Sequence, residues 1–151
     1  MASTDRDALV ALYNATEGGR WRRNKNWNTD APLSEWHGVK VNDQGRVVEL
    51  SLSRNNLQGH IPRQLGNLSA LERLDLSDNK LDGPIPKELG ALSKLERLWL
   101  EQNGLTVFPR AVAERFAAQN VDINTGDNPW TEPPADVLEL GMAYAARFLK
   151  D

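Results

Sequence analysis

The sequence predicts an α/β fold: a right-handed solenoid of stacked coils, with a short parallel β-sheet on its concave face and helical N- and C-terminal caps. The main observation is an internal repeat. Residues 47–70 and 71–94 align without gaps and are identical at 12 of 24 positions, where about one or two identities are expected by chance. Segments with helical periodicity flank the repeated part on both sides.

Each copy of the repeat predicts a short strand. In the pattern L-x-x-L-x-L, the last two leucines alternate with other residues, as expected for a strand with one buried face. A third copy begins over residues 95–109. The leucine pairs of the three copies are in register: Leu50 and Leu52, Leu74 and Leu76, and Leu98 and Leu100. One coil cannot bury its leucines alone, so the copies must stack.

An asparagine follows each predicted strand where the chain turns, at Asn55, Asn79 and Asn103. The amide and carbonyl of an inward asparagine can both bind backbone groups that the turn leaves unpaired. We therefore expect an internal asparagine ladder. A degenerate fourth copy over residues 121–123, ending near 128–130, would extend the stack.

The ends of a solenoid expose its core and need covers. Residues 4–16 have the helical spacing of an apolar stripe, formed by Leu9, Leu12 and Tyr13. Three tryptophans follow, at Trp21, Trp27 and Trp36. We expect them to pack this cap against the first coil rather than to form a ligand cage.

The C-terminal segment is predicted to be one helix over about residues 135–149. Its apolar residues have spacings of three and four on one face, which should cover the last coil: Val137, Leu140, Tyr144 and Phe148. The chain is then one domain over 1–151, divided into an N-terminal cap (1–46), about 3.5 repeats (47–130) and a C-terminal capping helix (131–151).

These segments resemble the leucine-rich-repeat family. The two full copies are similar to the plant-type consensus LxxLxLxxNxLxGxIPxxLGxLxx, and DRDALVALYNAT…NW…PLSEWHGVKV resembles the N-terminal cap of plant receptor-like proteins. That cap usually has a cysteine pair around its W-x-G-V motif, whereas here Lys40 and Val41 follow the motif. The segment NPWTEPPADVLELGMAYAARFL resembles the cap of intracellular relatives such as the Roco group. The resemblance implies protein or peptide recognition.

The outward residues of the predicted strands form the candidate binding surface, in three columns across the copies. The first column is Glu49, Arg73 and Arg97; the second is Ser51, Asp75 and Trp99, continued by Asp122; the third is Ser53, Ser77 and Glu101, continued by Asn124. Four strands about 4.8 Å apart give a strip under about 20 Å wide, which suits a peptide or a loop.

Trp99 stands out in this surface because repeat register places it in the position of Ser51 and Asp75. An exposed tryptophan between charged residues has the character of a binding hot spot. In the alternative interpretation Trp99 leans on Arg97 or packs toward the C-terminal cap.

Composition argues against several classes of function. The net charge of −3 gives no global basic field for nucleic acid, and no apolar run reaches the roughly 20 residues of a membrane span. The sequence has no phosphate-binding or dinucleotide-binding motif, so it predicts no cofactor. Its two histidines, His37 and His60, predict no shared metal or catalytic site. A basic cluster surrounds Trp21, and we interpret it as a solvated loop rather than a nucleic-acid or nuclear-import site: Arg20, Arg22, Arg23 and Lys25.

The chain has no cysteine, and its first residues lack the pattern of a secretory signal, so we expect a cytoplasmic protein. Two N-glycosylation sequons begin at Asn14 and Asn67, but about one is expected by chance, so they favour neither compartment.

The sequence therefore predicts a non-catalytic module that binds a peptide or protein through its concave face, within a signalling or immune-type regulatory protein. The first alternative is an extracellular receptor-type domain for a peptide or glycan. An enzyme is a further class, although nothing in the sequence indicates a substrate. A structural role, in which the solenoid spaces its neighbours or self-associates weakly, is the last alternative.

Overall fold

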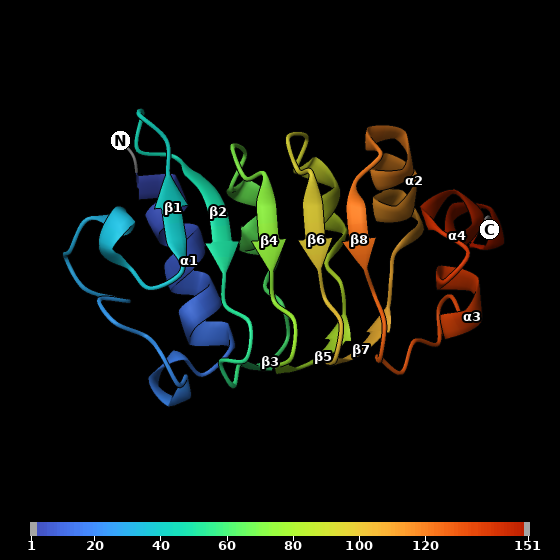
Figure 1. Ribbon diagram of the computed structural model, residues 1–151, viewed down its shortest axis with the longest axis horizontal. Helices are drawn as coiled ribbons and strands as arrows, with labels where there is room; N and C mark the ends of the chain where they lie inside the picture. Colours follow the sequence, from blue (N-terminus) through green and yellow to red (C-terminus); the bar gives the residue numbers. More distant parts are fainter. Residues whose placement is uncertain (1–2, 150–151) are drawn as a thin grey trace.

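The computed structural model describes residues 3–149 and arranges them as one row of stacked coils that runs from the N-terminal to the C-terminal end (Figure 1). The predicted solenoid is confirmed. Within the described residues, no helix is both long enough and apolar enough to cross a membrane. The division of the chain into two caps and about 3.5 repeats stays a prediction.

One side of the row is a five-stranded sheet. Its strands, in spatial order, are β1 (Val39–Val41), β2 (Val47–Ser51), β4 (Arg73–Asp75), β6 (Arg97–Trp99) and β8 (Asp122–Asn124). β1 is antiparallel to β2, and the other neighbours are parallel. The inward leucines of successive coils pair in register, Leu50 with Leu74 and Leu74 with Leu98.

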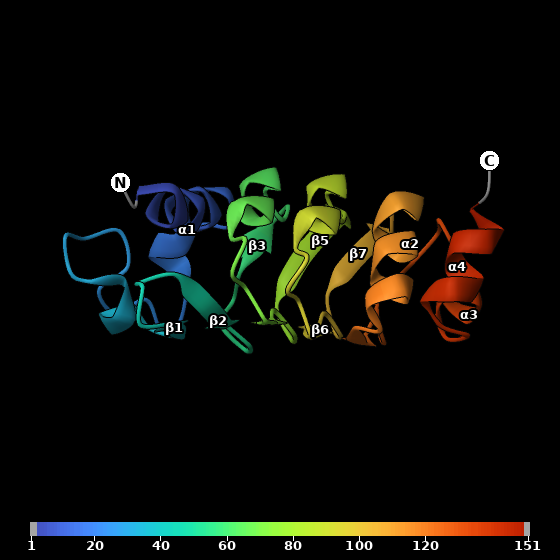
Figure 2. The same cartoon turned by 90° about the horizontal axis from the view of Figure 1, so that it is seen from above.

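Helices line the opposite side, as the view from above shows (Figure 2). They are η3 (Arg63–Asn67), η4 (Lys87–Ala91) and α2 (Arg110–Gln119), and a second sheet of β3 (Gln58–Gly59), β5 (Lys80–Pro84) and β7 (Gly104–Val107) leads into them. A proline precedes each of the three helices, where its fixed φ and missing N–H are tolerated. The altered third copy replaces a single 3₁₀ turn with a full α-helix.

The leucines of the repeats fill the space between the two sides, and nearly all of them are completely buried. The expected asparagine ladder is confirmed, with Asn128 as a fourth member. Asn79 Oδ1 accepts hydrogen bonds from the backbone N–H groups of Asn55 and Leu57, and its amide donates to the carbonyl of Leu52. Each asparagine of this kind ties its own turn to the preceding coil.

The N-terminal cap consists of α1 (Ser3–Ala15), η1 (Gly18–Arg20) and η2 (Leu33–Glu35) around a buried aromatic cluster. The Trp27 ring lies 4.7 Å from that of Trp21 and 5.1 Å from that of Trp36, measured between centroids. All three tryptophans are buried, so the expected packing role is confirmed.

An ion pair between the partly exposed Arg46 and the buried Asp5 joins this cap to the first repeat strand. Asp5 is 3% exposed and accepts hydrogen bonds from Arg46 Nε (2.8 Å), Arg46 Nη2 (2.9 Å) and the backbone N–H of Val47 (3.0 Å). These hydrogen bonds raise the pKa of Arg46 above its ordinary value. The cap is thus held by directed contacts as well as by apolar packing.

The C-terminal cap differs from the predicted single helix. It consists of two short helices, α3 (Ala135–Leu138) and α4 (Met142–Phe148), which are separated at Gly141, where φ is 104°. The residues turned inward are Leu138 and Ala145, with Met142 partly buried.

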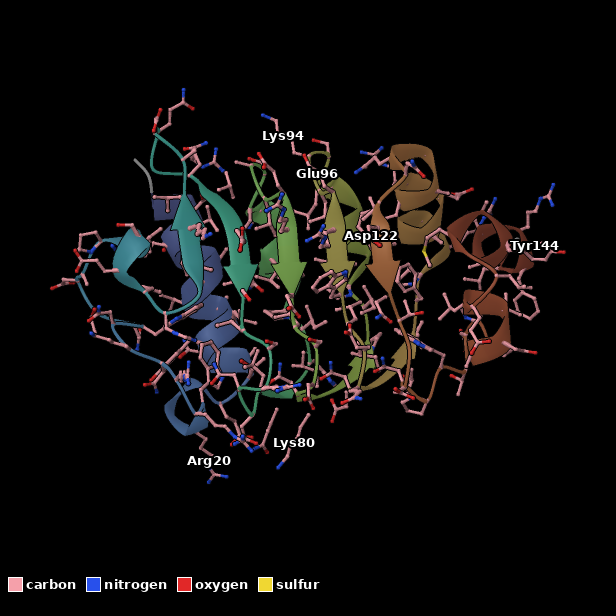
Figure 3. All side chains as sticks on the ribbon, in the orientation of Figure 1. Arg20, Lys80, Lys94, Glu96, Asp122 and Tyr144 are labelled. Carbon is pink, nitrogen blue, oxygen red and sulfur yellow. The ribbon has the colours of Figure 1, made fainter. Side chains whose placement is uncertain are left out.

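The predicted apolar face of this cap is therefore wrong. Three of its members are exposed: Leu140 (61%), Tyr144 (54%) and Phe148 (57%). Figure 3 shows Tyr144 projecting away from the rest of the chain. The segment has a second apolar set at helical spacing, formed by Leu138, Met142 and Ala145, and periodicity alone does not decide which set faces the core.

The register of the fourth strand also differs from the prediction. Ile123 pairs with Leu98, so Asp122 continues the first outward column and Asn124 the second, each one column earlier than expected. Asn128 lies five positions after Ile123, just as Asn103 lies five positions after Leu98. The ladder asparagine, rather than the Val121-Asp122-Ile123 alternation, sets the register.

Candidate functional site: the outer face of the five-stranded sheet

The strand face, defined here as the solvent-facing side of β2, β4, β6 and β8, carries the outward columns. In the first column Glu49, Arg73, Arg97 and Asp122 lie in register across the four strands. Arg73 Nη1 lies 3.7 Å from Glu49 Oε1, and Arg97 Nε lies 3.6 Å from Asp122 Oδ2. Figure 3 shows Asp122 on this face. The column holds two acidic and two basic groups, so its charges balance.

The second column consists of Ser51, Asp75, Trp99 and Asn124. Trp99 is half-buried, and the guanidinium carbon of Arg97 lies 4.8 Å from the centroid of its ring. The indole therefore leans on Arg97, as in the alternative interpretation, while part of it stays accessible. A cation held over a ring contributes about 0.5–1 kcal/mol at an exposed site, which helps to hold both side chains in place.

A shallow hollow of about 100 Å³ brings together six of the nine predicted site residues: Glu49, Ser51, Arg73, Asp75, Arg97 and Trp99. The hollow combines an aromatic edge, two guanidinium groups, two carboxylates and a hydroxyl. This set can receive a polar chain segment with a small apolar group.

The third column does not act as a unit. Ser77 was expected to be a contact residue, but it is only 8% exposed, and its hydroxyl donates to Asp75 Oδ1 at 2.7 Å. Ser77 therefore orients Asp75 instead of meeting a partner. Ser53 is exposed and lines a different cavity, and Glu101 is half-buried outside the Trp99 hollow.

At its N-terminal end, the strand face meets a cavity of about 550 Å³ built jointly by the cap and the first coil. Its lining residues are Arg22, Arg23, His37, Gly38, Ser51, Ser53, Arg54 and Asn55. Arg22 and Arg23 belong to the basic cluster that was expected to be a solvated loop. Arg20 does not line the cavity, and its Nε lies 3.4 Å from Glu17 Oε1. Figure 3 shows Arg20 at the same edge of the molecule as Lys80.

His37 contributes a largely neutral imidazole to this cavity. Burial and then the nearby charge of Arg23 lower the pKa of His37 from its ordinary value of 6.5. Within residues 3–149, no three His, Asp or Glu side chains are grouped so that they could hold a metal ion.

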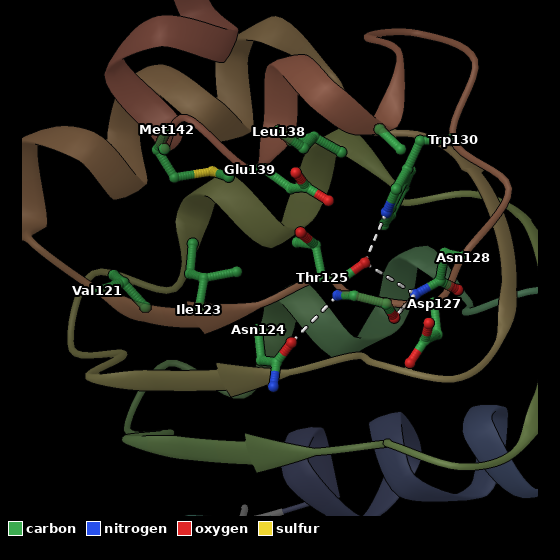
Figure 4. A pocket seen from close by; sticks show the side chains of 13 residues that line it. Val121, Ile123, Asn124, Thr125, Asp127, Asn128, Trp130, Leu138, Glu139 and Met142 are labelled. Carbon is green, nitrogen blue, oxygen red and sulfur yellow. Dashed lines mark hydrogen bonds between the residues drawn. The ribbon is translucent and has the colours of Figure 1, made fainter.

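At the other end, a pocket of about 350 Å³ lies between β8 and the C-terminal cap. Figure 4 shows Asn124, Thr125 and Asp127 on one wall, and Leu138, Glu139 and Met142 on the other. The hydrogen bond from Trp130 Nε1 to the carbonyl of Thr125 (2.8 Å) closes its inner side. Sequence reasoning missed this pocket, and the spacing from Ile123 to Asn128 is the signal that could have located its strand.

Comparison with known proteins supports the fold and the repeat. Residues 45–105 match the leucine-rich repeat family model. A probable leucine-rich repeat receptor-like protein kinase of Arabidopsis thaliana is 39% identical over 72 residues, which is 47% of this chain and 7% of that protein. The chain thus spans a small part of that relative.

Two solved structures have the same fold. The ectodomain of the plant membrane receptor kinase GASSHO1/SCHENGEN3 of Arabidopsis thaliana, in complex with CASPARIAN STRIP INTEGRITY FACTOR 2, superposes with a TM-score of 0.73 at 32% identity, covering 83% of this chain and 15% of that one. The PEPR1–AtPEP1 structure gives a TM-score of 0.70 at 25% identity, covering 85% and 18%.

These relatives overturn the expectation of a cytoplasmic protein. They include a probable receptor-like protein kinase and the ectodomain of a plant membrane receptor kinase, which points to the cell surface or the extracellular space. The expectation rested on the absence of cysteine and on first residues that lack the pattern of a secretory signal. The absence of cysteine does not determine the compartment, because the stacked leucines and the aromatic cap give this fold a core without disulfides.

Proposed function

Because the chain folds as a leucine-rich-repeat solenoid, we propose that it is the recognition module of a receptor-type protein and binds a peptide or protein segment across the strand face. The observation that carries the proposal is the hollow around Trp99, where neighbouring strands present aromatic, cationic and anionic groups in register. A half-exposed tryptophan beside arginine is typical of the few residues that dominate binding energy.

Unused hydrogen-bonding capacity beside the hollow supports the same proposal. Among the described residues, Arg97 Nε and Glu101 Oε1 are buried polar atoms without a hydrogen-bond partner, and Arg97 Nε has only the longer 3.6 Å ion-pair contact with Asp122 Oδ2. Polar atoms of this kind gain more from a ligand hydrogen bond than exposed ones do, since they are already removed from bulk water. A backbone amide or carbonyl of an extended peptide has the chemistry to satisfy them.

A peptide is favoured over a glycan because Trp99 is the one aromatic side chain in the three outward columns of the described strands. Sugar rings are usually bound by stacking on more than one aromatic face. The likeness of the C-terminal cap to the Roco group and a role in signalling stay predictions.

Selection from a random peptide library against the intact chain tests the proposal. We expect Trp99→Ala to weaken the selected peptides at least about tenfold, as for a hot-spot tryptophan. Tyr144→Ala is the matched control, because it removes an exposed aromatic residue away from the strand face. Selected peptides that bind Trp99→Ala as tightly as the wild type would contradict the proposal.

A further inference from the structure

Three arginines, Arg22, Arg23 and Arg54, are among the residues that line the cavity at the N-terminal end of the strand face. None of its described lining residues is acidic. Asp78 lies 3.2 Å from Arg54 Nε and offsets that charge from outside the cavity. The local excess of positive charge contrasts with the balanced first column and with the net charge of −3 for the whole chain.

The backbone that carries two of these arginines is fixed in place. Asn55 Oδ1 accepts a hydrogen bond from the N–H of Arg23 (2.7 Å), and its amide donates to the carbonyl of Arg23 (2.9 Å). The N–H of Arg22 donates to the carbonyl of Asn55 (3.1 Å). Asn55, the first member of the asparagine ladder, thus binds the cap in the way that later ladder asparagines bind the preceding coil. These hydrogen bonds place Arg22 and Arg23 at the rim of the strand face.

The opposite wall of the cavity is equally defined. Gly38 has φ of 80°, and a Cβ at this position would lie 2.2 Å from the carbonyl oxygen of Ser51. Only glycine therefore allows the cap to come this close to β2. The N–H of Ser51 donates to the carbonyl of Gly38 (2.8 Å). The two hydroxyl-bearing residues of the wall, Ser51 and Ser53, add hydrogen-bond donors to the arginines.

Ser51 lines both this cavity and the Trp99 hollow, so the two sites are neighbours on the strand face. One extended ligand can therefore occupy both. Guanidinium groups and hydroxyls together are the donor set that binds carboxylates.

We propose that this cavity is an anion subsite that holds a carboxylate of the bound peptide, so that the ligand lies across the strands with an acidic group at the N-terminal cap and continues past Ser51 toward Trp99. This inference rests on the proposed peptide-binding function and adds the charge of the ligand and its orientation.

Two short peptides separate the sources of the carboxylate. The first, acetyl-Gly-Glu-Gly-Glu-Gly-amide, carries acid only on side chains; the second, acetyl-Gly-Gln-Gly-Gln-Gly with a free C-terminus, carries it only at the end. Each is titrated into the ¹⁵N-labelled full chain by NMR. We expect backbone shifts at Gly38, Ser51, Ser53 and Asn55 with at least one peptide, and the peptide that causes them identifies the carboxylate.

Arg22→Gln combined with Arg23→Gln should weaken this binding about fivefold to tenfold, as expected for the loss of two partly screened charge contacts. The matched control is Arg63→Gln combined with Lys87→Gln, which removes the same charge from exposed positions on the helical side. A bound carboxylate should also raise the pKa of His37, a response that mere stabilisation of the fold would not produce.

The proposal is overturned if neither peptide shifts the cavity resonances, or if both double variants weaken binding equally. Library peptides that still depend on Trp99 but bind Arg22→Gln/Arg23→Gln normally would overturn the anion subsite and leave the proposed function standing. Carboxylate binding at the cavity without any dependence of library peptides on Trp99 would support the anion subsite and contradict the proposed role of the Trp99 hollow.

Discussion

At the N-terminal end of the solenoid the first coil is covered by packed aromatic rings and by an ion pair whose carboxylate is buried. At the C-terminal end two short helices cover the last coil and leave three large apolar side chains in solvent. The N-terminal cap continues the hydrogen-bond pattern of the coils, because Asn55 binds Arg23 as Asn79 binds the coil before it. Beyond Trp130, the C-terminal helices bury only Leu138 and Ala145 fully, with Met142 partly buried. We infer that the N-terminal cap is an integral part of the stacked coils, whereas the C-terminal cap only packs against the last coil.

The largest effect that tests this contrast should follow from Trp27→Ala. Trp27 contacts Tyr13, Trp21 and Trp36, and its indole N–H donates to the carbonyl of His37 (2.8 Å). Loss of a buried aromatic side chain of this size should lower the free energy of unfolding by about 3–5 kcal/mol. Urea denaturation measures it, and a loss below about 1 kcal/mol would show that the cap is not integral to the stack.

Asp5→Ala should have the next largest effect, about 2–3 kcal/mol, since it leaves Arg46 and the N–H of Val47 without their buried acceptor. The control is Asp78→Ala, which breaks an exposed ion pair and should cost less than about 0.5 kcal/mol. Equal losses in the two variants would mean that burial of Asp5 contributes nothing.

A smaller effect should appear in the pH dependence of stability. The pKa of His37 is lower in the folded chain than its ordinary value of 6.5, so as pH falls below that value the unfolded chain binds a proton first. The resulting contribution to the unfolding free energy is present above pH 6.5 and is lost as pH falls toward the folded pKa. Denaturation at pH 7.5 and pH 5 should show a greater loss for the wild type than for His37→Gln; identical losses would refute the assignment.

The smallest effect is expected at the C-terminal end. Changing Leu140, Tyr144 and Phe148 together to glutamine should alter the unfolding free energy by less than about 0.5 kcal/mol, because all three are exposed. Leu138→Gln, which places an amide in the buried position of the same cap, is the contrasting variant and should destabilise clearly. A large loss in the triple variant would mean that this cap is packed as tightly as the other.

The repeats and the C-terminal cap differ in how much of their structure could be predicted from the sequence. Leu50, Leu74 and Leu98 repeat at a fixed interval of 24 residues, and each meets the same surroundings, so the strands and the ladder could be predicted from register alone. The C-terminal segment has no such repetition. Its two apolar sets compete, and Gly141 interrupts the helix, so the buried set is decided by contact with α2, which has no local signal.

The strand face was predicted in part for the same reason. Column register brought Arg73, Asp75 and Trp99 together, but the burial of Ser77 depends on a hydrogen bond to Asp75 that the spacing does not reveal. The position of Arg22 and Arg23 depends on Asn55, which is more than thirty positions further along the chain. Contacts between repeat and cap follow no period, and sequence reasoning had no means to find them.

The asparagine ladder has a consequence for the length of ligand that such a chain can select. Each ladder side chain reaches back to the coil before it, as Asn103 does to Leu81 and Leu76, so an additional 24-residue coil would meet the same partners. Every coil adds about 4.8 Å between the arginine cavity and the C-terminal pocket, or about one and a half residues of an extended peptide. The number of coils then fixes, in discrete steps, the length of extended peptide that the proposed binding surface can hold between the two caps.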